Sequence, residues 1–126
     1  VFSGATGQQL PGPVGSFFAF ANFQGTVNVA AGDINGDGRD DLVAVAQGAQ
    51  GHVKVFSGLD GSLLSSYFAY PGFTRGVSVA ATDLDLDGSA EVITVASFNG
   101  HVKVFNGSTG AFFTSATLPT FNSSFL

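Results

Sequence analysis

Short apolar runs, each closed by a turn-forming residue, make up most of this chain. Residues 27–31 and 52–56 alternate apolar and polar side chains, while 42–46 and 63–70 are apolar runs of strand length. Glycine, aspartate, asparagine and serine, which favour turn conformations, bound each run. The pattern therefore predicts four consecutive strands, and since no ten-residue window has helical periodicity, we expect no helix.

The same pattern occurs twice. Residues 27–33 (VNVAAGD) match residues 77–83 (VSVAATD) at an offset of 50, and GHVKVF at 51–56 recurs unchanged at 100–105. A four-stranded antiparallel unit repeated about every 50 residues is typical of a β-propeller blade, whose neighbours bury both of its faces. We therefore expect an all-β fold built of propeller blades.

A third copy of the later part of the unit opens the chain. Residues 1–4 (VFSG) resemble 55–58, and residues 17–20 (FFAF) resemble 67–70 (YFAY). The sequence thus predicts an outer half-blade and connector at 1–26, with two strands in 1–20, and whole blades at 27–76 and 77–126. This organisation gives about two and a half blades per chain.

The composition argues against several classes of function. The 126 residues include 9 acidic and 4 basic side chains, for a net charge of −5, so we expect no binding to nucleic acid. The longest apolar stretches are about five residues, too short to span a bilayer, so no membrane insertion is expected, and no signal peptide opens this chain. The absence of cysteine excludes disulfides and thiolate chemistry.

The acidic residues are concentrated: all but Asp60 fall within 33–41 and 83–91. Both windows have the spacing D-x-[DN]-x-D-G-x-x-[DE], which places short oxygen ligands at alternate positions of a tight loop, as calcium requires. Side chains at positions 1, 3, 5 and 9 and the carbonyl at position 7 are the expected donors. They are Asp33, Asn35, Asp37, Arg39 (carbonyl) and Asp41 in the first loop, and Asp83, Asp85, Asp87, Ser89 (carbonyl) and Glu91 in the second.

Three alternatives bear on these loops. An EF-hand needs a glutamate at position 12, where this chain has Ala44 and Thr94. Magnesium suits such loops less well because it keeps several waters, and an acidic turn that binds nothing is the third reading. We expect two calcium ions per chain in a structural role, each adding about 1.5 kcal/mol at millimolar calcium.

Taken together, V-x-V-A-x-x-D, D-x-D-x-D-G and GHVKVF-x-G resemble the FG-GAP repeats of integrin α-subunit-type β-propellers and related bacterial surface proteins. The resemblance implies that the two acidic loops join the first and second strands of their blades and bind calcium. It also implies an extracellular or cell-surface protein that serves as an interaction scaffold.

Beside His52 and His101, no Ser, Cys or carboxylate stands in a recognisable nucleophile or general-acid context. The clustered carboxylates are assigned to the loops, so we expect no enzyme. The two histidines occupy equivalent repeat positions, which favours a packing role. The alternative is a ligand contact in each blade, as in a sugar-binding, lectin-like propeller with a glycan or protein ligand.

Propellers close with four to eight blades, and two and a half blades cannot close a ring. The sequence therefore predicts a homo-oligomer, a trimer or tetramer, whose ring is completed by several chains. Residues 1–20 would pair with an inner half-blade of another chain by strand exchange. A piece of a longer propeller is the competing explanation.

Overall fold

The protein is described by a computed structural model that covers residues 1–12, 14–97, 100–107 and 109–116. Within this part the fold is all-β and has no helix. The strands are β1 (Val27–Gly32), β2 (Asp41–Ala46), β3 (His52–Phe56), β4 (Leu63–Phe68), β5 (Val77–Thr82), β6 (Glu91–Ala96), β7 (His101–Phe105) and β8 (Phe112–Ala116).

The strands form two four-stranded antiparallel meanders, β1-β2-β3-β4 (blade 1) and β5-β6-β7-β8 (blade 2). Their registers repeat: Val29 pairs with Ala44 in blade 1, and Val79 pairs with Thr94 in blade 2. Each blade also has a register shift just before the end of its third strand, at Phe56 and at Phe105. The sequence repeat is thus a structural repeat, and the prediction of four-stranded propeller blades is confirmed.

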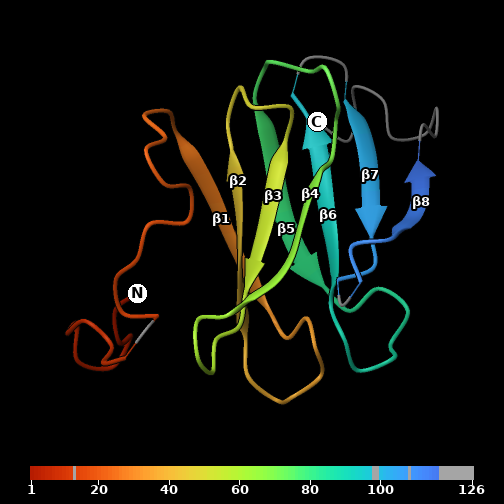
Figure 1. The fold of residues 1–126 in the computed structure, drawn as a ribbon. Helices are drawn as coiled ribbons and strands as arrows, with labels where there is room; N and C mark the ends of the chain where they lie inside the picture. Colours follow the sequence, from red (N-terminus) through yellow and green to blue (C-terminus); the bar gives the residue numbers. More distant parts are fainter. Residues whose placement is uncertain (13, 98–99, 108, 117–126) are drawn as a thin grey trace.

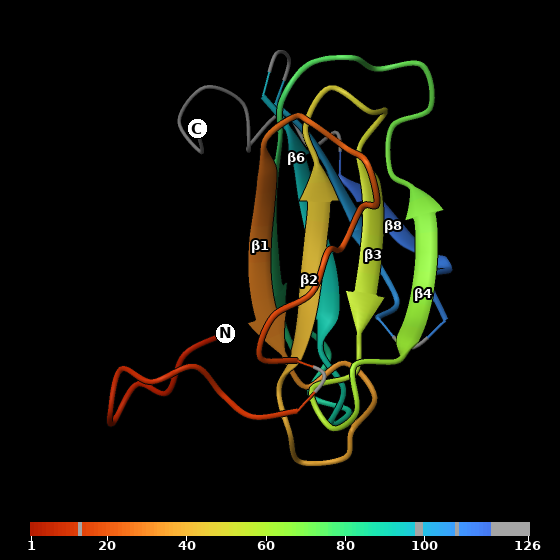
Figure 2. The ribbon, with the colours of Figure 1, turned by 60° about the vertical axis from the view of Figure 1, so that its left-hand side comes forward.

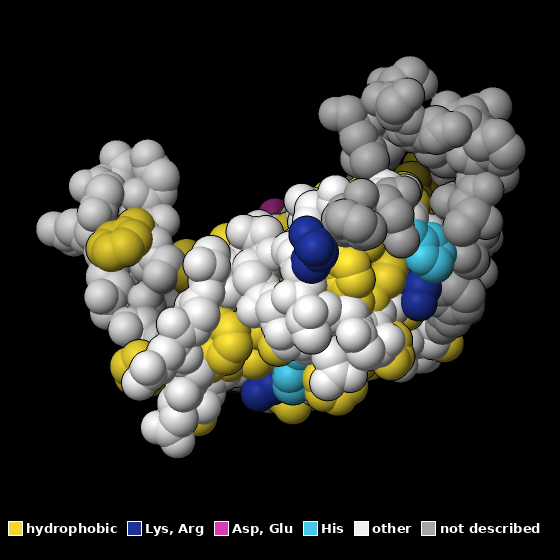
Figure 3. All heavy atoms as spheres, turned by 90° about the horizontal axis from the view of Figure 1, so that it is seen from above, with side chains coloured by type: hydrophobic (Ala, Val, Ile, Leu, Met, Phe, Trp, Pro, Cys, Tyr) yellow, Lys and Arg dark blue, Asp and Glu magenta, His cyan; other side chains and the backbone are white. Residues whose placement is uncertain are grey.

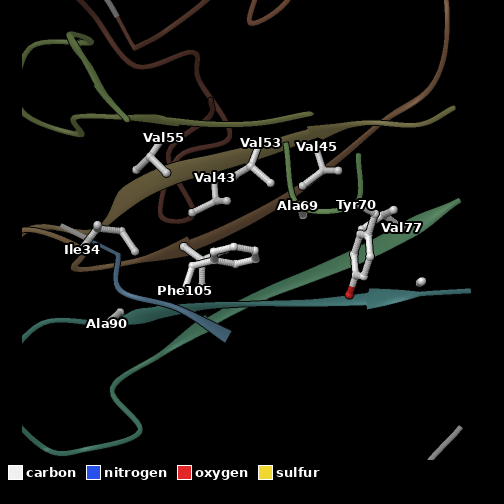
Figure 4. Packing of buried hydrophobic residues seen from close by; sticks show 12 residues of the cluster. Ile34, Val43, Val45, Val53, Val55, Ala69, Tyr70, Val77, Ala90 and Phe105 are labelled. Carbon is white, nitrogen blue, oxygen red and sulfur yellow. The ribbon is translucent and has the colours of Figure 1, made fainter. Parts of the chain in front are cut away.

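The two sheets pack face to face (Figure 1). Val43 and Val45 of β2 and Val53 and Val55 of β3 are fully buried. They belong to one cluster, drawn in Figure 4, with blade 2 side chains that include Val77, Val92 and Phe105. One face of each sheet is therefore apolar because the other sheet covers it.

A tyrosine at the end of blade 1 forms hydrogen bonds with blade 2. The Tyr70 hydroxyl lies 2.9 Å from the Thr94 carbonyl oxygen and 2.6 Å from the His101 carbonyl oxygen, and it accepts a bond from Thr94 Oγ1 at 3.2 Å. Tyr67, on β4, is different because its buried hydroxyl has no hydrogen-bond partner among the residues that the structure describes.

The first 26 residues depart from the prediction. The two strands expected within 1–20 are not formed in the described part, where a single bridge joins Phe2 to Gln9. The equivalent residues of the blades pair with strands from the same sheet, whereas residues 1–26 have no inner strands beside them. An isolated pair of strands is only marginally stable in water.

Candidate metal sites

Both acidic loops lie at the same end of the fold. Residues 33–40 join β1 to β2, and residues 83–90 join β5 to β6, in the lower part of Figure 1. Seen from the opposite end, in Figure 3, the surface shows histidine, lysine and arginine side chains and hardly any acidic ones. The fold therefore gathers most of the negative charge of the chain at one end.

In the first loop, carboxylate oxygens of Asp33, Asp37 and Asp41 all lie within 4.8 Å of one another. The loop backbone orients Asp33: its Oδ1 accepts hydrogen bonds from Gly36 N (2.9 Å) and Asp37 N (3.1 Å), and its Oδ2 accepts one from Gly38 N (2.8 Å). These bonds curl the chain around the first carboxylate, and Oδ2, which accepts one bond, keeps a lone pair for a cation.

Asp41, at the start of β2, is buried and held from two sides. Its Oδ2 accepts a hydrogen bond from Ile34 N at 2.9 Å, and its Oδ1 accepts one from Gly58 N at 2.9 Å. Sequence reasoning missed Gly58, although its recurrence as Gly107 was a usable signal. A Cβ at Gly58 would lie 1.9 Å from the Asp40 carbonyl oxygen, so only glycine fits this close approach.

In the second loop, four carboxylates converge. Oxygens of Asp83, Asp85, Asp87 and Glu91 all lie within 4.8 Å of one another. Asp83 accepts hydrogen bonds from Asp87 N (3.1 Å) and Gly88 N (2.8 Å), while the buried Glu91 accepts one from Leu84 N (2.8 Å). The longer glutamate thus accepts a bond from Leu84 N as Asp41 does from Ile34 N, its repeat equivalent.

The charges within this loop oppose one another. Desolvation and the nearby Asp87 charge raise the pKa of Asp85, and burial, with help from the charges of Asp85 and Asp87, raises the pKa of Glu91. Desolvation opposes ionisation of Asp83 as well, but the N–H groups of Gly88 and Asp87 outweigh it and lower its pKa. A bound cation would relieve the repulsion that raises the first two pKa values.

The donor set fits a hard divalent cation. It consists of oxygen atoms, with three carboxylates in one loop and four in the other, and no sulfur or imidazole takes part. Of the other predicted ligands, Asn35 lies inside the first loop, where its Oδ1 accepts a bond from Asp37 N at 3.3 Å. The backbone N–H groups of Arg39 and Ser89 donate to Asp37 and Asp87, and their carbonyls remain predicted ligands.

A single peptide group connects the two loops. The Ser89–Ala90 peptide, whose carbonyl is a predicted ligand of the second loop, donates its N–H to the Asp33 carbonyl oxygen at 2.8 Å. Ile34, the residue after Asp33, is fully buried, and a Cβ added to Gly107 would meet its side chain at 2.8 Å. The first loop is therefore part of the contact between the blades, which sequence reasoning did not foresee.

His52 and His101 lie in packing contacts between chain segments. The His52 ring packs 5.2 Å from Phe20 and 4.5 Å from Phe68, and its Nε2 is 2.9 Å from Ser66 Oγ. The His101 ring lies 5.6 Å from that of Tyr70. Burial lowers the pKa of both histidines, helped by a lysine two residues along the chain. These contacts favour the packing interpretation.

Comparison with known families agrees with this geometry. Residues 33–94 match the family model of the FG-GAP-like repeat, a span that starts at the first loop and includes the whole of the second. The chain carries an FG-GAP-like repeat. No curated protein and no solved structure matches the chain. The matched span includes all the residues whose carboxylates converge in the two loops.

Proposed function

We propose that the chain is a calcium-stabilised β-propeller module that serves as a structural and interaction scaffold. The observation that carries this proposal is the convergence of Asp83, Asp85, Asp87 and Glu91 within 4.8 Å, repeated by Asp33, Asp37 and Asp41 at the same place in the other blade. Acidic turns are common, but two turns with the same ligand spacing in a matched FG-GAP-like repeat favour two calcium sites.

Within each site the chain supplies the ligands and holds them in place. In the first loop, Asp33 and Asp41 are fixed by backbone N–H groups, so little ordering remains to be done when an ion binds. Calcium, when bound, supplies the positive charge that offsets the clustered carboxylates. Two ions would bring the formal net charge from −5 to −1, which removes most of the repulsion at that end.

The expected stabilisation is moderate. For a dissociation constant of about 0.1 mM, millimolar calcium adds about 1.5 kcal/mol per site. Two sites would therefore supply about 3 kcal/mol, a substantial share of the roughly 5 to 15 kcal/mol that stabilises a domain.

Sites of this affinity suit a calcium-rich surrounding, so we place the module outside the cell or at its surface. Among the residues that the structure describes, no helix is long and apolar enough to cross a membrane. The proposal gives the chain no catalytic role, because its clustered carboxylates serve as ion ligands.

Isothermal calorimetry with calcium tests the proposal by counting sites. The wild-type chain should bind two ions, and Asp37→Ala and Asp87→Ala should each bind one. Asp40→Ala is the matched control: Asp40 lies in the first loop outside the carboxylate cluster, and the second loop has Ala90 at that position. Wild-type protein that binds no calcium, or an Asp40→Ala variant that loses a site, would contradict the assignment.

A further inference from the structure

Equivalent residues of the two blades differ sharply in exposure. Val77 of β5 is 1% exposed, whereas Val27, its counterpart on β1, is 37% exposed. Val79 is half-buried against the core cluster, whereas its counterpart Val29 is 68% exposed. These pairs have the same residue type and register, so the difference comes from what covers each sheet. Blade 1 covers this face of β5, whereas no sheet of the described residues covers the same face of β1.

The uncovered face forms an apolar cleft. Val27, Val29, Leu42, Ala44 and Phe56 of blade 1 make one wall, which we call the head face, and Phe17–Phe20 with Phe23 line the other wall. The volume is about 490 Å³. In blade 2 the counterparts of these blade 1 residues meet the valines of β2 and β3. The cleft is therefore an inter-blade core from which one sheet is missing.

Residues 17–23 already reproduce part of the missing blade. Lys54 Nζ donates to the Ala19 carbonyl oxygen at 3.1 Å and lies 5.0 Å from the Phe20 ring. In blade 2, Lys103 Nζ donates to the Ala69 carbonyl oxygen at 2.8 Å and lies 4.8 Å from the Tyr70 ring.

The aromatic contacts repeat in the same way. The Phe17 and Phe56 rings are 5.0 Å apart, and those of Tyr67 and Phe105 are 4.7 Å apart. Residues 17–23 thus lie across blade 1 (Figure 2) as the end of β4 and the following connector lie on blade 2. Within the described residues, no strands equivalent to β1, β2 and β3 lie beside residues 17–23.

The opposite end of the chain carries a matching surface. Leu84, Ile93 and Val95 of blade 2 stand at the repeat positions of Ile34, Val43 and Val45, the blade 1 residues that cover blade 2. Leu84 is 51% exposed, and Ile93 and Val95 are half-buried. Val102 and Val104 on the same sheet are each only 5% exposed, so the accessible part lies on β6 and the loop before it. We call Leu84, Ile93 and Val95 the tail face.

We propose that the head face binds the tail face of a second copy of this chain, as blade 2 binds blade 1 within one chain. The contact is heterologous, because each copy uses a different surface, and successive copies therefore add head to tail. It needs no strand exchange, because β5 and β6 already pair with β7 and β8 of the same chain. Of the tail-face residues, Leu84 lies in the second acidic loop, between the predicted ligands Asp83 and Asp85, whereas Ile93 and Val95 lie on β6.

Light scattering after size exclusion, in calcium and over a range of protein concentrations, tests the interface. The wild-type mass should rise with concentration. Val29→Asp on the head face and Ile93→Lys on the tail face should each weaken association by more than about tenfold, because a charge would be buried in an apolar contact. Leu59→Asp is the control: Leu59 is 59% exposed in the turn between β3 and β4 and belongs to neither face.

Mixing the two face variants gives the decisive result. Each alone should be monomeric, but an equimolar mixture should form a heterodimer, because the intact head of Ile93→Lys meets the intact tail of Val29→Asp. Circular dichroism checks that each variant is folded. If Val29→Asp does not fold, Val29→Gln is used in its place. A wild-type chain that stays monomeric at every concentration overturns the proposal, even if the cleft takes up a small apolar molecule. Association retained by Ile93→Lys alone also overturns it, since that would indicate a symmetric head-to-head contact.

Discussion

Ile34 offers the sharpest test of how the first metal loop is built into the fold. Its side chain is fully buried beside Gly107 and Ala90, whereas Leu84, at the same position of the second loop, is 51% exposed. Ile34→Ala removes three carbon groups, worth about 0.8 kcal/mol each, and leaves a cavity between the blades. We expect a loss of about 3 kcal/mol in the free energy of unfolding.

Leu84→Ala is the matched control, because it removes the same number of carbon groups from a half-exposed position and leaves no cavity. Its expected cost is about 1 kcal/mol or less. Urea unfolding followed by circular dichroism, at one fixed calcium concentration, measures both values. Equal losses for the two variants would refute the reasoning, since they would mean that Ile34 does not fill the contact between the blades.

Three further predictions concern other parts of the chain. Tyr67→Phe should leave the free energy of unfolding unchanged or raise it by up to about 1 kcal/mol, because it removes a buried hydroxyl without a described partner. Tyr70→Phe should cost about 1 kcal/mol in the same urea assay, because the Tyr70 hydroxyl is hydrogen-bonded. Burial raises the pKa of Tyr67 above its ordinary value of 10.0, so stability should fall as the pH rises past 10, and Tyr67→Phe should reduce this slope in pH-dependent unfolding. Gly58→Ala should strongly lower stability in thermal unfolding, because its Cβ would overlap the Asp40 carbonyl oxygen. Gly4→Ala, at the equivalent repeat position with open space around it, should be nearly neutral in the same assay. Equal effects of the two variants would contradict this prediction.

The strands and the two loops could be predicted because their determinants are local. Alternation of apolar and polar residues at 27–31 predicts a strand there, and the D-x-[DN]-x-D-G spacing predicts a tight acidic turn wherever it occurs. Both features recur at the same offset, and the structure places the second copy in the same register as the first.

The remaining features depend on neighbours that a repeat pattern does not specify. Ile34 and Leu84 are both apolar residues at one repeat position, yet only Ile34 has a blade beside it. Residues 1–20 resemble the outer strands of a blade, but the described ones form no strands, and no described inner strands lie beside them to pair with. A repeat therefore specifies the blade, and the environment of each face is set by what packs against it.

Thermal unfolding of the wild-type chain in millimolar calcium and in excess chelator tests the central claim most directly. Two filled sites worth about 3 kcal/mol predict a midpoint roughly 10 °C higher with calcium than with chelator. An equal midpoint under the two conditions would contradict the account, because loops that hold calcium in the folded state alone must stabilise that state.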